Sequence, residues 1–236
     1  MTNAGGHQAS GNLRGVFRAW RFLLQTLLIA AYLMVSPRIV GHWPVQLVLE
    51  AVLLASVLVT VSANPGWHRL RSALVVLWLV SVVGTLLSVH SITPQLRQWY
   101  RSLELLTVVP LLAVLAAGML AFVQRQRRLT VDSIFATVAA YLLVGLLFAQ
   151  LYLCLLAWDP GSFTLPGDGA GASNSVLLAE MTYFSLVTLT TVGYGDVIPA
   201  THPARMLAVF QAIVGQFYLA VVVAMFVGMY SAQRKV

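Results

Sequence analysis

Long apolar stretches alternate with short polar segments along most of the sequence. The expected apolar stretches are residues 19–36, 45–62, 73–90, 104–123, 134–157 and 204–230. Each is long enough, or nearly so, to cross the hydrocarbon core of a bilayer, about 30 Å thick, as an α-helix. The pattern therefore predicts an all-α membrane protein with six transmembrane helices.

The first of these stretches is the weakest, and it could also be the core of a signal peptide. Small residues mark the cleavage site of a signal peptide, whereas Pro37 and Arg38 follow this stretch. We therefore expect residues 19–36 to remain as a membrane span. Residues 1–18 are rich in Gly, Asn, Gln and Ser and show no apolar period, which predicts a disordered cytoplasmic tail.

Composition supports a membrane protein, since 59% of the 236 residues are hydrophobic and 9% are charged, against about 25% charged in soluble domains. The net charge of +7 does not indicate nucleic-acid binding, because the basic residues follow the predicted topology. The side with few basic residues holds Arg38, Arg97, Arg101 and Arg205. The other side holds Arg14, Arg18, Arg21, Arg69, Arg71, Arg125, Arg127, Arg128, Arg234 and Lys235. The positive-inside rule therefore places both termini in the cytoplasm.

A glycine-containing polar run, Thr-Thr-Val-Gly-Tyr-Gly-Asp at 190–196, lies between the fifth and sixth stretches. A potassium ion loses its hydration water only where other oxygens replace it, and a row of backbone carbonyls facing one axis can supply them. Gly193 and Gly195 can adopt the dihedrals that this row needs without a Cβ penalty. We predict a filter that ends at Gly195 and binds K⁺ at Thr191, Val192, Gly193 and Tyr194.

The segment before this run has the length of a short helix. Residues 173–175 (Ser, Asn, Ser) are good N-cap residues for a helix across 176–189, and the glycine-rich stretch 166–171 precedes them as a flexible external turret. A helix of this length cannot span the bilayer, so we expect it to be re-entrant and surrounded by protein. Glu180 is favourable near the helix N-terminus; attraction of cations is the alternative role.

The run and the predicted helix before it resemble the selectivity filter and pore helix of tetrameric potassium channels. In that family an aromatic residue at the position of Tyr183 donates a hydrogen bond to the aspartate that matches Asp196. The resemblance also makes Phe184 and Thr190 part of the filter support. Val187 stands where some bacterial channels carry a glutamate that pairs with the same aspartate, so this chain lacks that pair.

The sixth stretch resembles the inner helix of the same family. Gly215 stands at the family's hinge position, nineteen residues after Asp196. A glycine inside a membrane helix also permits close packing, so the hinge and packing roles both stay open. The same alignment places Gln216, Leu219 and Val223 along the cavity. Gln216 would contact ions or water there, or form an interhelical hydrogen bond instead.

The resemblance implies a homotetramer, because one filter strand per chain cannot enclose an ion. Its domains would be a four-helix membrane domain at 19–128, in the position of a voltage sensor, and a pore domain at 129–236. Voltage sensors of this layout carry Arg or Lys at every third position of the fourth span, whereas residues 105–123 contain none. Steep voltage dependence needs several charges that move through the field. We therefore expect a potassium-selective channel that is not steeply voltage-gated.

Two alternatives remain open: a weakly selective cation channel, and a non-conducting membrane sensor or assembly subunit. The sequence contains no recognisable set of nucleophile, base and acid, no phosphate-binding glycine loop and no metal-ligand spacing. We therefore expect neither an enzyme nor a cofactor besides the permeant potassium ion. The expected partners are membrane lipid and potassium ions, not nucleic acid, and the expected location is the bacterial plasma membrane.

Overall fold

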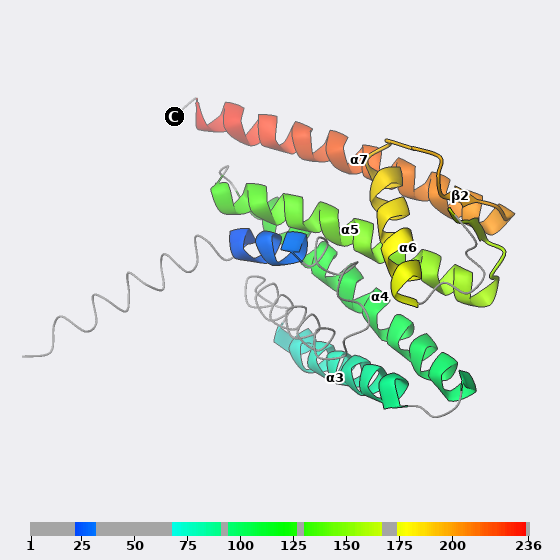
Figure 1. The fold of residues 1–236 in the computed structure, drawn as a ribbon. Helices are drawn as coiled ribbons and strands as arrows, with labels where there is room; N and C mark the ends of the chain where they lie inside the picture. Colours follow the sequence, from blue (N-terminus) through cyan, green and yellow to red (C-terminus); the bar gives the residue numbers. More distant parts are fainter. Residues whose placement is uncertain (1–21, 32–67, 91–93, 127–129, 167–173, 235–236) are drawn as a thin grey trace, which may run out of the picture.

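The computed structural model describes residues 22–31, 68–90, 94–126, 130–166 and 174–234. Its helices are Phe22–Ala31, α3 (His68–His90), α4 (Pro94–Gln124), α5 (Val131–Trp158), α6 (Asn174–Leu189) and α7 (His202–Gln233). Two short strands, β1 (Phe163–Thr164) and β2 (Ile198–Pro199), pair antiparallel, with Phe163 opposite Pro199. The described part of the chain is therefore almost entirely α-helical, as predicted (Figure 1).

Three helical stretches are long and apolar enough to cross a membrane: Thr107–Gln124 within α4, all of α5 and all of α7. The shorter apolar helical segments among the described residues are Phe22–Ala31, Ser72–Gly84 and Val176–Leu189. The last four predicted spans fall on α3, α4, α5 and α7, and the predicted re-entrant helix falls on α6. The tail 1–18, the span 45–62 and most of the turret 166–171 lie outside the described residues.

The start of α5 is defined by a reciprocal cap. The Thr130 hydroxyl accepts the Ser133 amide at 3.1 Å, and the Ser133 hydroxyl accepts the Thr130 amide at 3.0 Å. Two amides that the first helical turn would leave without an intrahelical partner are thereby satisfied. The cap lies next to residue 129, where the predicted pore domain begins.

α4 and α5 pack through complementary faces. On α4, every fourth residue is fully buried: Leu111, Leu115, Met119 and Val123. On α5 the same cluster contains the small residues Ala136, Ala139 and Ala140, together with Leu143. Small residues on one helix let the large side chains of its neighbour fill the space between the two axes. α3 packs against the opposite side of α4, away from α5 (Figure 1).

The helix Phe22–Ala31 lies beside the first turns of α5 (Figure 1). The Phe22 amide donates to the Asp132 carboxylate at 3.2 Å, and the Thr26 hydroxyl donates to the Phe135 carbonyl at 2.9 Å. The residue numbers rise in the same direction along both helices, so the two helices run parallel. Two membrane helices that cross the bilayer in the same direction would run parallel in this way.

α5, α6 and α7 fall within the predicted pore domain and are here called the pore module; α6 lies across the other two (Figure 1). Three rings hold the second half of α6 against α5 and β1, with each pair packed edge to face. The centroid distances are 5.4 Å for Tyr152–Phe163, 5.1 Å for Tyr152–Phe184 and 5.3 Å for Phe163–Phe184. Edge-to-face pairs stabilise an aromatic cluster beyond the area that they bury. A backbone hydrogen bond of 2.8 Å, from the Ala200 amide to the Ser162 carbonyl, joins the segment that carries β1 to the segment that carries β2.

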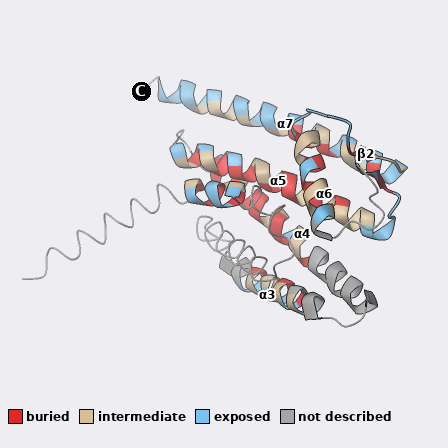
Figure 2. Ribbon diagram, in the orientation of Figure 1, coloured by how far each residue is buried: buried red, intermediate tan, exposed pale blue. Residues whose placement is uncertain are grey.

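α7 is the least covered helix of the pore module. Its buried residues are Ala204, Gln211 and Gly215, which recur at helical spacing on the side that faces α5 and α6. The remaining surface carries large exposed apolar side chains, and most of the helix is coloured as exposed in Figure 2. The single chain thus leaves most of α7 without protein contacts.

Candidate functional site

The segment after α6 has a backbone unlike any other in the described part of the chain. Positive φ angles occur there at Thr191 (60°), Gly193 (61°) and Gly195 (81°), that is, at every second residue. Glycine adopts such angles without a Cβ clash, so the two glycines are where this backbone requires them. Thr191 is β-branched, and a positive φ is strained for such a residue. The surrounding contacts must therefore hold this backbone in place.

Those contacts come from the last turn of α6. The amides of Thr190, Thr191 and Val192 donate to the carbonyls of Leu186, Thr188 and Val187, at 3.0, 3.0 and 2.9 Å. The Thr190 hydroxyl also donates to the Leu186 carbonyl at 2.7 Å. The N–H groups of the inner half of the segment therefore point back at the helix.

Residues 190–196 are exposed in the single chain. No donor among the described residues forms a hydrogen bond with the carbonyls from Thr191 to Tyr194. Within the described ranges, no three His, Cys, Asp or Glu side chains meet in a group that could hold a metal ion. The carbonyl oxygens from Thr191 to Tyr194 are therefore exposed and have no hydrogen-bond donor within the described structure.

The outer end of the segment is tied to α6 by Tyr183 and Asp196. The Tyr183 hydroxyl donates to one Asp196 carboxylate oxygen at 2.6 Å, and the other oxygen accepts the Val197 amide at 3.0 Å. The hydrogen bond from Tyr183 is the main reason why the pKa of Asp196 lies below its usual value. This is the bond that the family resemblance implied. The rings of Tyr183 and Tyr194 also lie parallel, with centroids 6.3 Å apart.

The inner end of α6 is held at the Leu189 carbonyl. The Tyr141 hydroxyl on α5 donates to this oxygen at 2.9 Å. On α7, a Cβ added to Gly215 would lie 2.6 Å from the same oxygen and 3.0 Å from the Leu189 Cδ1 atom. Real side chains essentially never approach a backbone oxygen so closely, so glycine is needed here for close packing. Of the two roles predicted for Gly215, this contact directly supports packing; α7 itself continues unbroken from His202 to Gln233.

The predicted cavity residues and the remaining support residues lie in different places. Gln216, Leu219 and Val223 are exposed on α7 in the single chain, so a cavity lined by them would need further copies of the chain. Phe184 is buried in the aromatic cluster and packs α6 against α5. Glu180 is half-buried one turn before Tyr183.

A buried network of four residues, here called the three-helix network, was missed in the sequence analysis. It consists of Gly145 and Tyr152 on α5, Ser185 on α6 and Gln211 on α7. The Tyr152 hydroxyl donates to the Gln211 amide oxygen at 2.6 Å. The Gln211 amide nitrogen donates to the Ser185 carbonyl at 3.0 Å and to the Ser185 hydroxyl at 2.7 Å. The Ser185 hydroxyl in turn donates to the Gly145 carbonyl at 2.6 Å.

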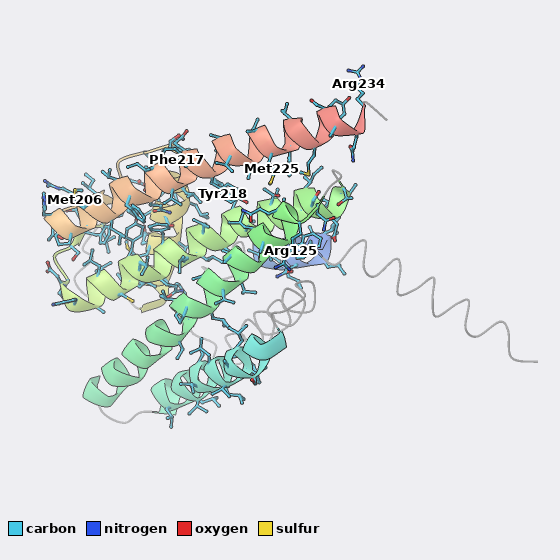
Figure 3. The ribbon with its side chains drawn as sticks, turned by 180° about the vertical axis from the view of Figure 1, so that it is seen from behind. Arg125, Met206, Phe217, Tyr218, Met225 and Arg234 are labelled. Atoms are coloured by element: carbon cyan, nitrogen blue, oxygen red, sulfur yellow. The ribbon has the colours of Figure 1, made fainter. Side chains whose placement is uncertain are left out.

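One signal in the sequence could have identified Gln211. It lies four residues before Gly215 and thus on the same helix face, which the predicted packing role of Gly215 would turn towards α6. Gln216 was the polar residue predicted to matter in this helix, and it is exposed, whereas Gln211 is fully buried. Tyr218, seen between α7 and α5 in Figure 3, makes a separate contact, from its hydroxyl to the Thr137 carbonyl at 2.6 Å.

Comparison with known proteins identifies the pore module. Residues 137–232, which contain most of α5, all of α6 and most of α7, match the family model described as "Ion channel". Protein LctB of Bacillus caldotenax is 38% identical over 101 residues, which cover 43% of this chain and 75% of the relative. Protein LctB of Geobacillus stearothermophilus is 35% identical over 124 residues, covering 52% and 91%.

A plant protein shows a shorter similarity. The two pore potassium channel c of Oryza sativa subsp. japonica is 38% identical over 81 residues, which cover 34% of this chain and 15% of that protein. The similarity to an ion channel family favours a channel over an enzyme, as the sequence analysis expected. This chain therefore belongs to the same family as the two LctB proteins, and its residues 137–232 are an ion channel domain.

Proposed function

We propose that this protein is a potassium-selective channel that conducts K⁺ passively through the backbone carbonyls of residues 191–195. The observation that carries the proposal is the positive φ at Thr191, Gly193 and Gly195 in a segment whose inner amides are all bound to α6. An alternating backbone with bound amides leaves its carbonyls available to replace hydration water around a cation. The similarity to plant two pore potassium channels supports potassium as the ion.

Conduction through this segment requires a homotetramer. One chain contributes one strand of oxygens, and four strands around an axis are the simplest way to surround the ion. The exposed apolar surface of α7 supports such an assembly, since it includes Phe210 at 57% exposure and Phe217 at 68% exposure. Contacts between copies and with lipid would cover this surface. Gln216, Leu219 and Val223 would then line the cavity below the filter.

The proposed topology has six spans with both termini in the cytoplasm of a bacterial cell. The parallel direction of the helix Phe22–Ala31 and the start of α5 supports it, because the first and fifth spans of such a chain cross the membrane in the same direction. The four-helix domain at 19–128 would surround the pore domain at 129–236. Membrane lipid is then the partner of the outer surface.

Voltage is not the main gating stimulus in this proposal. The apolar stretch Thr107–Gln124 of α4 contains no Lys, Arg, Asp or Glu, so little protein charge moves through the field. A gate would lie at the filter or in α7 near Gly215. The close contact between Gly215 and Leu189 connects these two places.

Flux from purified protein in liposomes tests the proposal. We expect potassium and rubidium to permeate and sodium to be largely excluded. Gly193→Ala should abolish the flux while leaving the protein inserted. A Cβ at this position meets no atom within 4 Å, so its cost in the single chain comes from the φ of +61° that it must adopt. Equal permeability to sodium and potassium in the native protein would exclude selectivity, and no cation flux at all would favour a non-conducting subunit.

A further inference from the structure

We propose that Gln211 is a positioning residue through which the inner helix α7 sets the position of α6 and hence the geometry of the filter. This inference rests on the proposed channel function. Gln211 is fully buried, as are Tyr152 and Ser185, with which it forms hydrogen bonds. All members of the three-helix network belong to one chain, so the arrangement does not depend on how the copies assemble.

The hydrogen bonds allow only one orientation of the Gln211 amide. Its oxygen accepts from the Tyr152 hydroxyl, and its nitrogen donates both hydrogens to Ser185, one to the carbonyl and one to the hydroxyl. A flipped amide would place its oxygen against the Ser185 carbonyl, which has no hydrogen to donate. The Ser185 hydroxyl already donates to the Gly145 carbonyl. Each donated hydrogen in the network thus has its own acceptor. The network therefore fits one register of α7 against α6 only.

The last turn of α6 connects Ser185 to the filter through the backbone and its hydrogen bonds. The three residues that follow Ser185 on α6 accept the amides of Thr190, Thr191 and Val192. A shift or rotation of α6 at Ser185 therefore moves the carbonyls that hold the inner half of the filter backbone. Thr191 has a strained positive φ, so it is sensitive to the loss of that support.

Tyr218 provides a matched control for a merely structural role. Its hydroxyl forms a hydrogen bond of 2.6 Å between α7 and the Thr137 carbonyl of α5, the same length as the bond from Tyr152 to Gln211. This bond does not involve α6. Tyr218→Phe and Tyr152→Phe each remove one hydroxyl from a contact between α5 and α7, and only Tyr152 belongs to the network that reaches Ser185.

Permeability ratios in planar bilayers test the role of Gln211. Gln211→Met keeps the length of the side chain and removes both bonds to Ser185 and the bond from Tyr152. The permeability to sodium relative to potassium should rise about tenfold, a change of about 1.4 kcal/mol that lies within what the loss of three buried hydrogen bonds can supply. Tyr152→Phe keeps the bonds to Ser185 and should give a smaller rise. Tyr218→Phe should keep the native ratio, even where its melting temperature falls as much as that of Gln211→Met.

Hydrogen–deuterium exchange gives a second readout that does not need conduction. Gln211→Met should accelerate exchange of the Thr190, Thr191 and Val192 amides about tenfold or more, because α6 no longer holds their acceptors in one position. Tyr218→Phe should leave these amides at the native rate. Equal acceleration in both variants, or native exchange in Gln211→Met, would overturn the role of Gln211. Failure of the native protein to select potassium would instead overturn the channel proposal, and the exchange result would still decide the role of Gln211.

Discussion

The two long helices of the pore module, α5 and α7, are similar in apolar character and very different in burial. Twelve of the 28 residues of α5 are buried within the chain, against three of the 32 residues of α7 (Figure 2). α5 is covered by α4, by α6 and by the helix Phe22–Ala31, whereas α7 contacts its own chain mainly along one narrow face. Apolar sequence therefore establishes that a helix avoids water, and it leaves open which surface covers that helix.

The narrow contact face of α7 differs in composition from the rest of that helix. Its fully covered residues are Ala204, Gln211 and Gly215, which are small or hydrogen-bonding, and partly buried apolar side chains such as Tyr218, Met225 and Phe226 pack against the core beside them. The contact face of α5 instead combines alanines with fully buried Leu143 and Tyr152. α5 is thus held by ordinary core packing. α7 is held to its chain by close approach, by specific hydrogen bonds and by a few partly buried apolar side chains, and in the proposed tetramer further copies and lipid would provide the rest of its cover.

Truncating one large side chain on each helix is the strongest test of this difference. Leu143→Ala should lower the free energy of unfolding by about 2–5 kcal/mol, because it leaves a cavity in the α4–α5 core. Phe217→Ala removes a side chain that is 68% exposed in the single chain, so it should mainly reduce the fraction of tetramer. Thermal melts measure the loss of stability. Native mass spectrometry at several protein concentrations measures the fraction of tetramer. A concentration-independent loss for Phe217→Ala would contradict the assignment of its face to an interface between copies.

Two glycines that contact α6 from opposite sides sharpen the comparison. A Cβ on Gly215 would meet the Leu189 backbone oxygen at 2.6 Å, whereas a Cβ on Gly145 would meet the flexible Leu186 Cδ2 atom at 2.7 Å. A backbone atom held by its helix cannot move away, so Gly215→Ala should cost about 1–3 kcal/mol of stability, and Gly145→Ala should cost less. Melting temperatures of the two variants decide the order. A larger loss for Gly145→Ala would show that the Leu189 backbone moves away from α7 more easily than the Leu186 side chain moves away from α5.

The loop between α6 and α7 should respond to acid at its outer end, where Asp196 lies. The pKa of Asp196 is below its usual value of 3.8, mainly because the carboxylate accepts a hydrogen bond from Tyr183. The contact with the carboxylate is therefore complete above pH 3.8 and is lost as the pH falls through the lower pKa of the folded protein. Potassium current should decline only below that value in external pH titrations. Tyr183→Phe should move the decline to higher pH, and an unchanged midpoint would show that this bond does not support conduction.

The smallest expected effect is that of voltage. Neither the apolar stretch Thr107–Gln124 of α4 nor the middle of α5 or α7 carries a charged side chain. Each elementary charge that crosses the field contributes about 2.3 kcal/mol per 100 mV, so a protein without such charges has no steep response. Conductance–voltage curves should show only the weak dependence that arises from ions within the filter. Several elementary gating charges per channel would contradict this expectation.

Most of the local features could be predicted from the sequence. The apolar stretches at 134–157 and 204–230 coincide with α5 and α7, and the helix expected at 176–189 coincides with α6. The positive φ angles at Gly193 and Gly195 fall where the glycines indicated an unusual backbone. The hydrogen bond between Tyr183 and Asp196 followed from the family resemblance. These features depend on neighbouring residues or on a short motif, so a single sequence contains them.

The contacts between helices could not be predicted in the same way. Hydropathy does not distinguish Gln211 from Gln216, since both are amides in an apolar helix, and only the packing of α7 buries the first and exposes the second. The same packing places Gly215 against the Leu189 carbonyl, which favours close contact as the reason for the glycine.

The sequence by itself determined where the described part of the chain is helical, which loop has an unusual backbone and how the outer end of that loop is tied, because these depend on hydropathy, on glycine dihedrals and on residues of one motif. Only the tertiary structure decided which polar groups are buried together and which apolar faces remain uncovered. A buried hydrogen bond such as that of Tyr152 with Gln211 joins residues 59 positions apart. Its existence depends on the distance and angle between two helices, which no local pattern of residues specifies.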